Sequence, residues 1–211
     1  MRSKLLSAMV AASVALPLAA AAGDNVTYSY ADLAYVTTDI DGVNEDLDGF
    51  ALRGSYEVTD QAFLFGSYTD QSAESGGADV DYATFTLGGG YAWSLSDRTD
   101  MYGKLGYVSS EVEVSVPGLG GFSVDDNGFL LGFGLRGRVA QQFELEGAVN
   151  YTDYSDSGDD TSLGAAARWF FTDQFSAFAE GEFGDDVTTY GIGMRWNFGG
   201  NAGGQRVAQQ K

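Results

Sequence analysis

The chain has 211 residues, 30 of them acidic and 11 basic, and its net charge of −19 argues against nucleic acid as a partner. It contains no cysteine, which excludes disulfide bonds and a cysteine-linked lipid anchor, and no histidine, which removes the commonest general base and metal ligand. Thirty glycines, two prolines and an aromatic content of 14% are typical of strands and turns. We therefore expect one all-β domain that is not an enzyme and has no cofactor.

The first 22 residues have the pattern of a cleaved export signal. A basic start at residues 1–4 is followed by an apolar run at 5–19 and by three small residues at 20–22. The alternative, a transmembrane helix, is disfavoured because the run is short and rich in alanine. A Sec-type signal peptide is expected at 1–22, and its removal leaves nine basic against 30 acidic residues, a net charge of −21.

The rest of the chain is divided by two kinds of polar segment. Short turns are expected at 58–61, 96–99, 139–142 and 171–174, and acidic, glycine-rich loops near 38–48, 70–79, 111–126, 154–160 and 184–186. Short turns that alternate with longer polar loops are typical of a transmembrane barrel. Four turns and five loops predict ten strands, or eight if the segment 184–186 is only a kink.

The expected strands alternate between an apolar and a polar face. Phe50, Leu52 and Tyr56 share one face, while Arg53 and Glu57 share the other, and the same alternation recurs at 101–108, 129–136 and 145–151. Two places fit less well. Phe178 falls on the polar face, and the register of the first strand is unclear, which suggests a β-bulge near residues 28–35.

Charge placement favours a membrane barrel over a soluble secreted β-sandwich binding protein, which would also have one apolar face. The basic residues within strands all lie opposite the apolar face, and each would cost about 2–4 kcal/mol if it faced lipid at the midplane. We therefore predict a closed antiparallel up-and-down transmembrane β-barrel over residues 23–198. Its lumen is predicted to hold an ion-pair network of Arg53, Glu57, Lys104, Arg136, Arg138, Glu144, Glu146, Arg168, Glu180, Glu182 and Arg195.

The last expected strand is strongly amphipathic. One face carries Tyr190, Ile192, Met194, Trp196 and Phe198, and the other carries Arg195 and Asn197. We expect the barrel-assembly machinery to recognise this aromatic-ended strand after periplasmic chaperones have delivered the chain. Aromatic residues near the turns are expected to form a girdle at the membrane interface.

Several of these segments resemble a known family. Residues 26–39, 49–56 and 65–68, with Arg136, Arg195 and the closing strand, resemble the small outer-membrane β-barrels common in xanthomonads and related proteobacteria. Those barrels are similar to the broader outer-membrane-protein-A-like and opacity-protein, porin-like barrels. The resemblance implies an integral barrel of the Gram-negative outer membrane with a polar lumen and exposed loops. One departure is the polar tail 199–211, because members usually end at the closing aromatic residue.

The acidic segments suggest a weak metal candidate. Asp39, Asp41, Glu45, Asp46 and Asp48 offer the oxygen ligands that calcium and magnesium prefer, although their spacing is not that of an EF-hand. The alternative is a set of solvated loop carboxylates that repel one another. Divalent cations could bridge such loops to anionic lipopolysaccharide, which with outer-membrane lipid is the expected surrounding of the barrel.

Two functions remain open from the sequence. The first is a structural and surface-interaction role with acidic extracellular loops and a lumen closed by ion pairs. The second is a narrow porin-like channel for ions or small solutes, because a ten-stranded barrel lies between the filled eight-stranded and the open sixteen-stranded cases.

Overall fold

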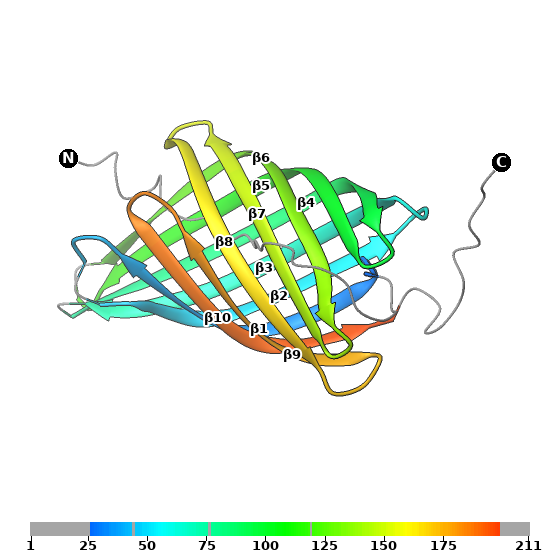
Figure 1. Ribbon diagram of the computed structural model, residues 1–211. Coiled ribbons are helices and arrows are strands. Elements are labelled where there is room, and N and C mark those ends of the chain that lie inside the picture. Colours follow the sequence, from blue (N-terminus) through cyan, green and yellow to red (C-terminus); the bar gives the residue numbers. More distant parts are fainter. Residues whose placement is uncertain (1–25, 44, 76, 119, 199–211) are drawn as a thin grey trace.

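The computed structural model describes residues 26–43, 45–75, 77–118 and 120–198. These residues form ten antiparallel strands, each paired with its neighbours in sequence, and β1 pairs with β10 to close a barrel (Figure 1). The strands are β1 (Tyr30–Ile40), β2 (Leu47–Glu57), β3 (Ala62–Ser75), β4 (Ala78–Ser96), β5 (Thr99–Val116), β6 (Gly120–Ala140), β7 (Phe143–Tyr154), β8 (Gly158–Phe170), β9 (Phe175–Phe183) and β10 (Val187–Asn197). The ten-stranded closed barrel is confirmed, and neither eight strands nor a sandwich describes the chain. The expected signal peptide 1–22 and tail 199–211 lie outside the described residues.

One end of the barrel, called the turn end here, carries the connections 58–61, 97–98, 141–142 and 171–174. All four lie where the sequence predicts turns. The two four-residue turns share one device: the Thr59 hydroxyl accepts the N–H groups of Gln61 and Ala62, and the Thr172 hydroxyl accepts those of Gln174 and Phe175. The repeated Thr-Asp-Gln sequence therefore folds twice into the same side-chain-stabilised turn.

The opposite end, called the acidic end here, carries the connections 41–46, 76–77, 117–119, 155–157 and 184–186. The expectation of long loops is wrong, because most of the acidic segments extend the strands and end in tight hairpins. These segments still carry strand-favouring residues at alternating positions, such as Val80, Val112 and Val124. Gly77 and Gly158 adopt the positive φ angles of 82° and 92° that such tight hairpins require.

The first strand is regular, so the expected β-bulge near residues 28–35 is wrong. β1 keeps an unbroken register with both β2 and β10. Asp32 and Ala34 point into the lumen, whereas Leu33 is 57% exposed on the outer surface. The irregular pattern arises because Tyr28 and Tyr30 are aromatic residues that face inward.

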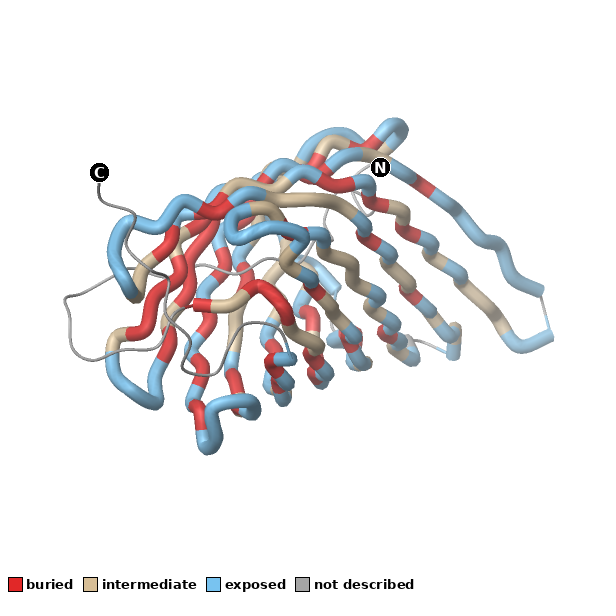
Figure 2. Tube along the Cα trace, turned by 90° about the vertical axis from the view of Figure 1, so that its right-hand side faces the viewer, coloured by how far each residue is buried: buried red, intermediate tan, exposed pale blue. Residues whose placement is uncertain are grey.

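The two faces of the barrel wall separate apolar from polar side chains. Exposed and buried positions alternate along the strands (Figure 2), and large exposed apolar residues lie on the outer surface of every strand. The described segments contain no apolar helix of the length that a bilayer requires. Phe178 faces inward, as its parity predicts, and its ring fits because Gly193 on the neighbouring strand has no side chain: a Cβ there would lie 2.6 Å from the ring.

Candidate functional site

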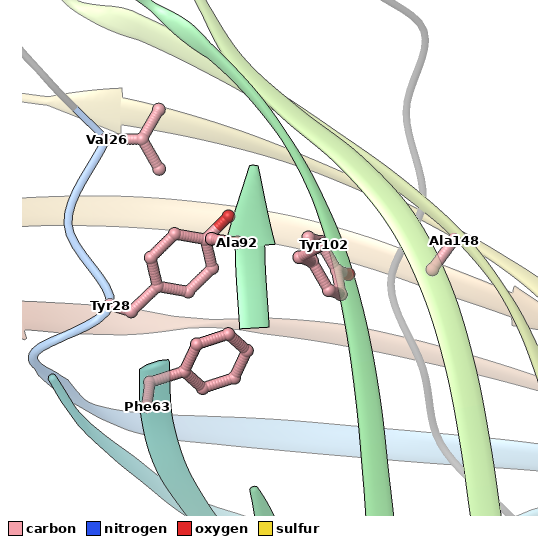
Figure 3. Close-up of a cluster of buried hydrophobic side chains, with 6 residues drawn as sticks. All are labelled: Val26, Tyr28, Phe63, Ala92, Tyr102 and Ala148. Carbon is pink, nitrogen blue, oxygen red and sulfur yellow. The ribbon is translucent and has the colours of Figure 1, made fainter. Parts of the chain in front are cut away.

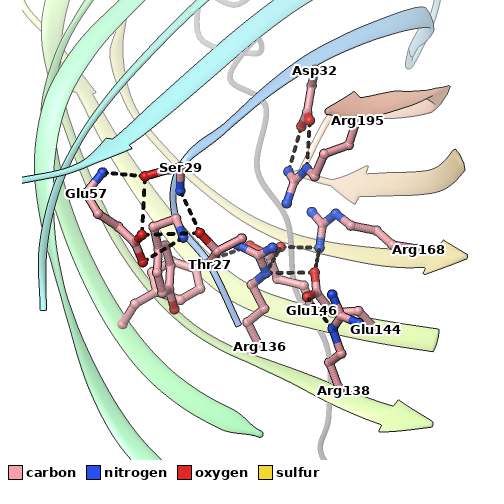
Figure 4. A network of polar contacts seen from close by, with 12 residues as sticks. Thr27, Ser29, Asp32, Glu57, Arg136, Arg138, Glu144, Glu146, Arg168 and Arg195 are labelled. Atoms are coloured by element: carbon pink, nitrogen blue, oxygen red, sulfur yellow. Dashed lines mark hydrogen bonds and ion pairs between the residues drawn. The ribbon is translucent and has the colours of Figure 1, made fainter. Parts of the chain in front are cut away.

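The centre of the polar lumen is Glu144, which is almost completely buried near the turn end. Its Oε1 lies 2.7 Å from Arg136 Nε and 3.1 Å from Arg168 Nη1, and its Oε2 lies 3.9 Å from Arg138 Nε. The β6–β7 register places Arg138 directly opposite Glu144, while Arg168 comes from β8. The two strands that flank β7 therefore supply three guanidinium groups to one carboxylate, two from β6 and one from β8 (Figure 4).

Glu146 extends this network. Its Oε2 lies 2.5 Å from Arg168 Nη1 and 3.8 Å from Arg136 Nε, and the Tyr102 hydroxyl donates a 2.7 Å hydrogen bond to its Oε1. The Arg136 guanidinium also lies over the rings of Tyr28 and Tyr30, at 5.3 and 5.6 Å. Buried charges in such a cluster hold one another in place, and the loss of one partner leaves the others unpaired.

Two further ion pairs link strands elsewhere in the lumen. Arg53 of β2 donates two hydrogen bonds, of 2.7 and 2.5 Å, to Glu180 of β9. Arg195 of β10 donates two, of 2.7 and 2.6 Å, to Asp32 of β1. Sequence reasoning missed Asp32, although its parity with Tyr30 was the available signal.

Three members of the expected network have other partners. Glu57 is not in an ion pair within the described chain: its carboxylate accepts hydrogen bonds from the Thr27 and Ser29 hydroxyls and from the Tyr28 N–H. Glu182 accepts a hydrogen bond from Ser162. Lys104 lies 5.8 Å from the Phe65 ring centroid, and no described carboxylate lies within 4 Å of it. These three residues face the lumen, but the sequence alone cannot show which side chains lie opposite them at the same height.

The chain before β1 enters the lumen at the turn end. Val26, Tyr28 and Ser29 are buried there, and the Tyr28 ring stacks on Phe63 with 4.6 Å between centroids. With Val26, Tyr28 and Phe63, the side chains of Tyr102, Ala92 and Ala148 form an apolar cluster, called the turn-end cluster here (Figure 3). The residues 26–29, which we call the N-terminal strap, thus occupy one mouth of the barrel.

The lumen is also filled near the acidic end. Leu47 and Tyr82 are buried in a cluster to which six strands contribute, with Ile40, Ala73, Val80, Val112 and Val187 packed against them. A cavity of about 100 Å³ is lined by Arg53, Thr69, Thr86, Lys104 and other lumen residues. The turn-end cluster lines this cavity through Tyr28, Phe63 and Tyr102.

The weak metal candidates lie at the β1–β2 connection. Asp39 is within β1 and Asp48 within β2, where Asp48 accepts a 2.6 Å hydrogen bond from Thr37; Asp41, Glu45 and Asp46 lie between the strands. In the described ranges, no three acidic side chains converge as a metal-binding group.

The apolar residues of the closing strand lie on the outer surface. Tyr190, Ile192, Met194, Trp196 and Phe198 are all between 43% and 65% exposed. Near the turn end a continuous row of aromatic rings crosses three strands, with centroid separations of 5.2 to 6.5 Å: Trp169, Phe171, Phe175, Trp196 and Phe198. Such a row has the position and composition of an interfacial girdle.

Comparisons with known proteins agree with this architecture. A sequence profile described as the outer membrane protein beta-barrel domain matches residues 8–198. Among solved structures, the NanC porin has a TM-score of 0.51 at 8% identity, over 80% of this chain and 100% of that one. Ail, the attachment invasion locus protein of Yersinia pestis, has a TM-score of 0.47 at 18% identity, over 81% of this chain and 97% of its own. Neisserial surface protein A has a TM-score of 0.42 at 15% identity, over 80% and 95% of the two chains. A comparison with curated proteins finds no match.

Proposed function

We propose that this chain, which belongs to the outer membrane protein beta-barrel domain family, acts at the cell surface as a structural and interaction protein with a non-conducting lumen. It is an integral outer-membrane barrel with transmembrane strands. The acidic end faces the outside. The turn end, where β1 begins and β10 ends, faces the periplasm. The narrower xanthomonad type remains a prediction.

The observation that carries the proposal is the filling of the lumen at two heights. Near the turn end the N-terminal strap packs on Phe63 and Tyr102, and the Glu144 cluster lies beside it. Near the acidic end, apolar side chains from six strands meet around Leu47 and Tyr82. An ion crossing the lumen would have to separate buried charges and pass an apolar layer, and both steps are costly.

A narrow channel for ions or small solutes is the second candidate. The polar cavity beside Lys104 and Arg53 favours it, because a transient opening of either cluster would connect that cavity to one side of the membrane.

Planar-bilayer recording of the refolded full-length mature protein separates the two candidates. We expect no single-channel steps from protein that shows the heat-modifiable gel mobility of a folded barrel. Reproducible steps would overturn the closed-lumen proposal. A variant with Tyr28→Ala and Phe63→Ala, which empties the turn-end cluster, shows whether the acidic-end cluster alone keeps the barrel silent.

The biogenesis and lipid partners are proposals as well. The exposed aromatic residues of β10 support recognition by the barrel-assembly machinery after chaperone delivery. Lipopolysaccharide surrounds the outer half of the barrel, with divalent cations between its phosphates and the carboxylates of the acidic end. A calcium titration followed by calorimetry tests the cation part, and the absence of both heat and thermal shift would contradict it.

A further inference from the structure

The hairpin formed by the outer ends of β5 and β6 projects beyond its neighbour. β6 pairs with β7 only from Gly128 onward, and Asp126 and Asn127 bond the β7–β8 connection, so the segment from Gly120 to Asp125 has β5 on one side and no described strand on the other. β5 and β6 are 18 and 21 residues long, whereas β7 has 12. β5 pairs with β4 as far as Ser115, so the projecting part is held on its β5 side and is open on its β6 side.

The two faces of this hairpin differ sharply. Register pairs place Phe122 opposite Val114 and Val124 opposite Val112, and Val112 packs against the buried cluster at the barrel mouth. The other face pairs Glu111 with Asp125 and Glu113 with Ser123. Phe122 is 63% exposed and Val124 36%, so the apolar face continues outward from the barrel mouth and is left uncovered.

The surroundings of this face carry charge of one sign. The segments 39–48, 70–81, 111–126, 153–160 and 184–186 contain many carboxylates and no lysine or arginine. Within the described residues, every basic side chain lies in the lumen wall or, for Arg98, at the turn end. A second copy of this chain would bring like charges together, and a polyanion would be repelled.

From these observations we infer that the Phe122 face is a docking surface for a cationic amphipathic polypeptide, one that presents apolar side chains beside lysine or arginine. The carboxylates attract and orient the basic groups, and the apolar side chains cover Phe122 and its neighbours. This inference rests on the proposed surface-interaction role and names the chemistry of the partner.

The test uses the full-length mature protein in nanodiscs of zwitterionic lipid without lipopolysaccharide, with empty nanodiscs as the blank. The probe is a short fluorescent peptide of alternating lysine and leucine, followed by anisotropy. We expect saturable binding that becomes about tenfold weaker in Phe122→Ser, equivalent to about 1.4 kcal/mol. Val43→Ser, which changes another exposed apolar residue at the same end, leaves the affinity unchanged.

Two further arms separate docking from charge attraction alone. A peptide in which serine replaces leucine binds much more weakly, and raising the salt from about 50 to about 300 mM weakens the binding of the original peptide. The pair Glu113→Gln with Asp125→Asn weakens binding more than the pair Asp60→Asn with Asp97→Asn at the turn end.

Equal binding of the two peptides, or unchanged affinity in a folded Phe122→Ser variant, would overturn the inference. That result would leave the closed-lumen proposal intact, because conductance is measured separately. Conversely, a conducting barrel that still bound the peptide would overturn only the proposed lumen state.

Discussion

Asp32 and Arg195 face each other across the seam where the first and last strands close the barrel. They are direct register partners in the β1–β10 ladder, and two hydrogen bonds of 2.6 and 2.7 Å join them. Both side chains are buried, so neither charge can turn to bulk water when the other is removed. This ion pair therefore joins the two strands that close the barrel and also balances two buried charges in the lumen.

Replacing Arg195 with leucine should destabilise the barrel by about 3–5 kcal/mol, because it leaves the Asp32 charge buried without its partner. The double variant Asp32→Asn with Arg195→Leu should recover part of this loss. Urea unfolding in lipid vesicles measures both effects, with Asp97→Ala at the turn end as the control. If the single and double variants were equally stable, the pair would have no role in closure.

Glu144→Gln should be the most damaging conservative substitution in the lumen. It removes a charge that lies within 4 Å of Arg136, Arg138 and Arg168, and about 3–5 kcal/mol is the expected loss. Glu57→Gln, which affects hydrogen bonds to the strap but no described ion pair, should cost about 1–3 kcal/mol or less. The ranking is read from vesicle unfolding midpoints, and the reverse order would contradict the assignment of Glu144 as the centre.

Glu57→Ala should release the N-terminal strap without opening a conducting path. The variant removes three hydrogen-bond acceptor contacts to Thr27, Tyr28 and Ser29, while the cluster around Leu47 remains. Amide hydrogen exchange at Tyr28 should become faster, and bilayer recordings should stay silent. Unchanged exchange at Tyr28 would show that stacking on Phe63 alone holds the strap.

Gly193→Ala should hinder closure of the barrel. A Cβ there would lie 2.4 Å from the Leu33 carbonyl oxygen and 2.6 Å from the Phe178 ring, contacts that require the strands to separate. Gly54→Ala is the matched control, because its nearest neighbour would be the Tyr30 carbonyl oxygen at 3.8 Å. The overpacked variant should lose about 1–3 kcal/mol, and equal folding yields of the two variants would contradict this view.

Asp126 should make the β7–β8 hairpin sensitive to acid. Burial opposes its ionisation, but hydrogen bonds from the Ser157 hydroxyl and from the N–H groups of Asn127 and Asp156 outweigh burial and hold the pKa of Asp126 below its usual value. The stabilisation is complete above the unfolded pKa of about 3.9 and is lost as the pH falls through the lower folded-state pKa.

The readout is the exchange protection of the Asp156 N–H, corrected for its intrinsic rate, between about pH 5 and about pH 2. Protection should fall at the acidic end of this range in the native protein. In Asp126→Asn it should not change over the range, and a parallel decline in that variant would assign the effect to another group.

The sequence predicted much of the fold because period-two alternation and turn chemistry are local signals. The four turns, the ten strands and the outward apolar face follow from residues close together in the chain. Thr59 and Thr172, for example, stabilise their turns by accepting hydrogen bonds from N–H groups two and three residues further on. The acidic segments were misread because charge and glycine suggest loops, whereas Val80 and Val112 keep the strand pattern on the lumen side.

The site was less predictable because its contacts depend on which strands face each other across the lumen. Arg53 and Glu180 meet although 127 positions separate them in the chain. Predicting the inward aromatic rings also requires knowing which residues lie beside them on the adjacent strand. Phe63 and Phe178 fit because Gly90 and Gly193 leave room there. Parity identified inward charged residues, but it could not assign Glu57 to the strap or find Asp32 as the partner of Arg195.

The one-sided distribution of charge along the barrel axis also determines whether the barrel can invert in a bilayer. Once the acidic end has emerged from a leaflet, inversion would require dozens of carboxylate oxygens to lose their hydration and cross hydrocarbon. The barrel therefore keeps the orientation in which it was inserted. The barrier to inversion, and not the relative stability of the two orientations, maintains it.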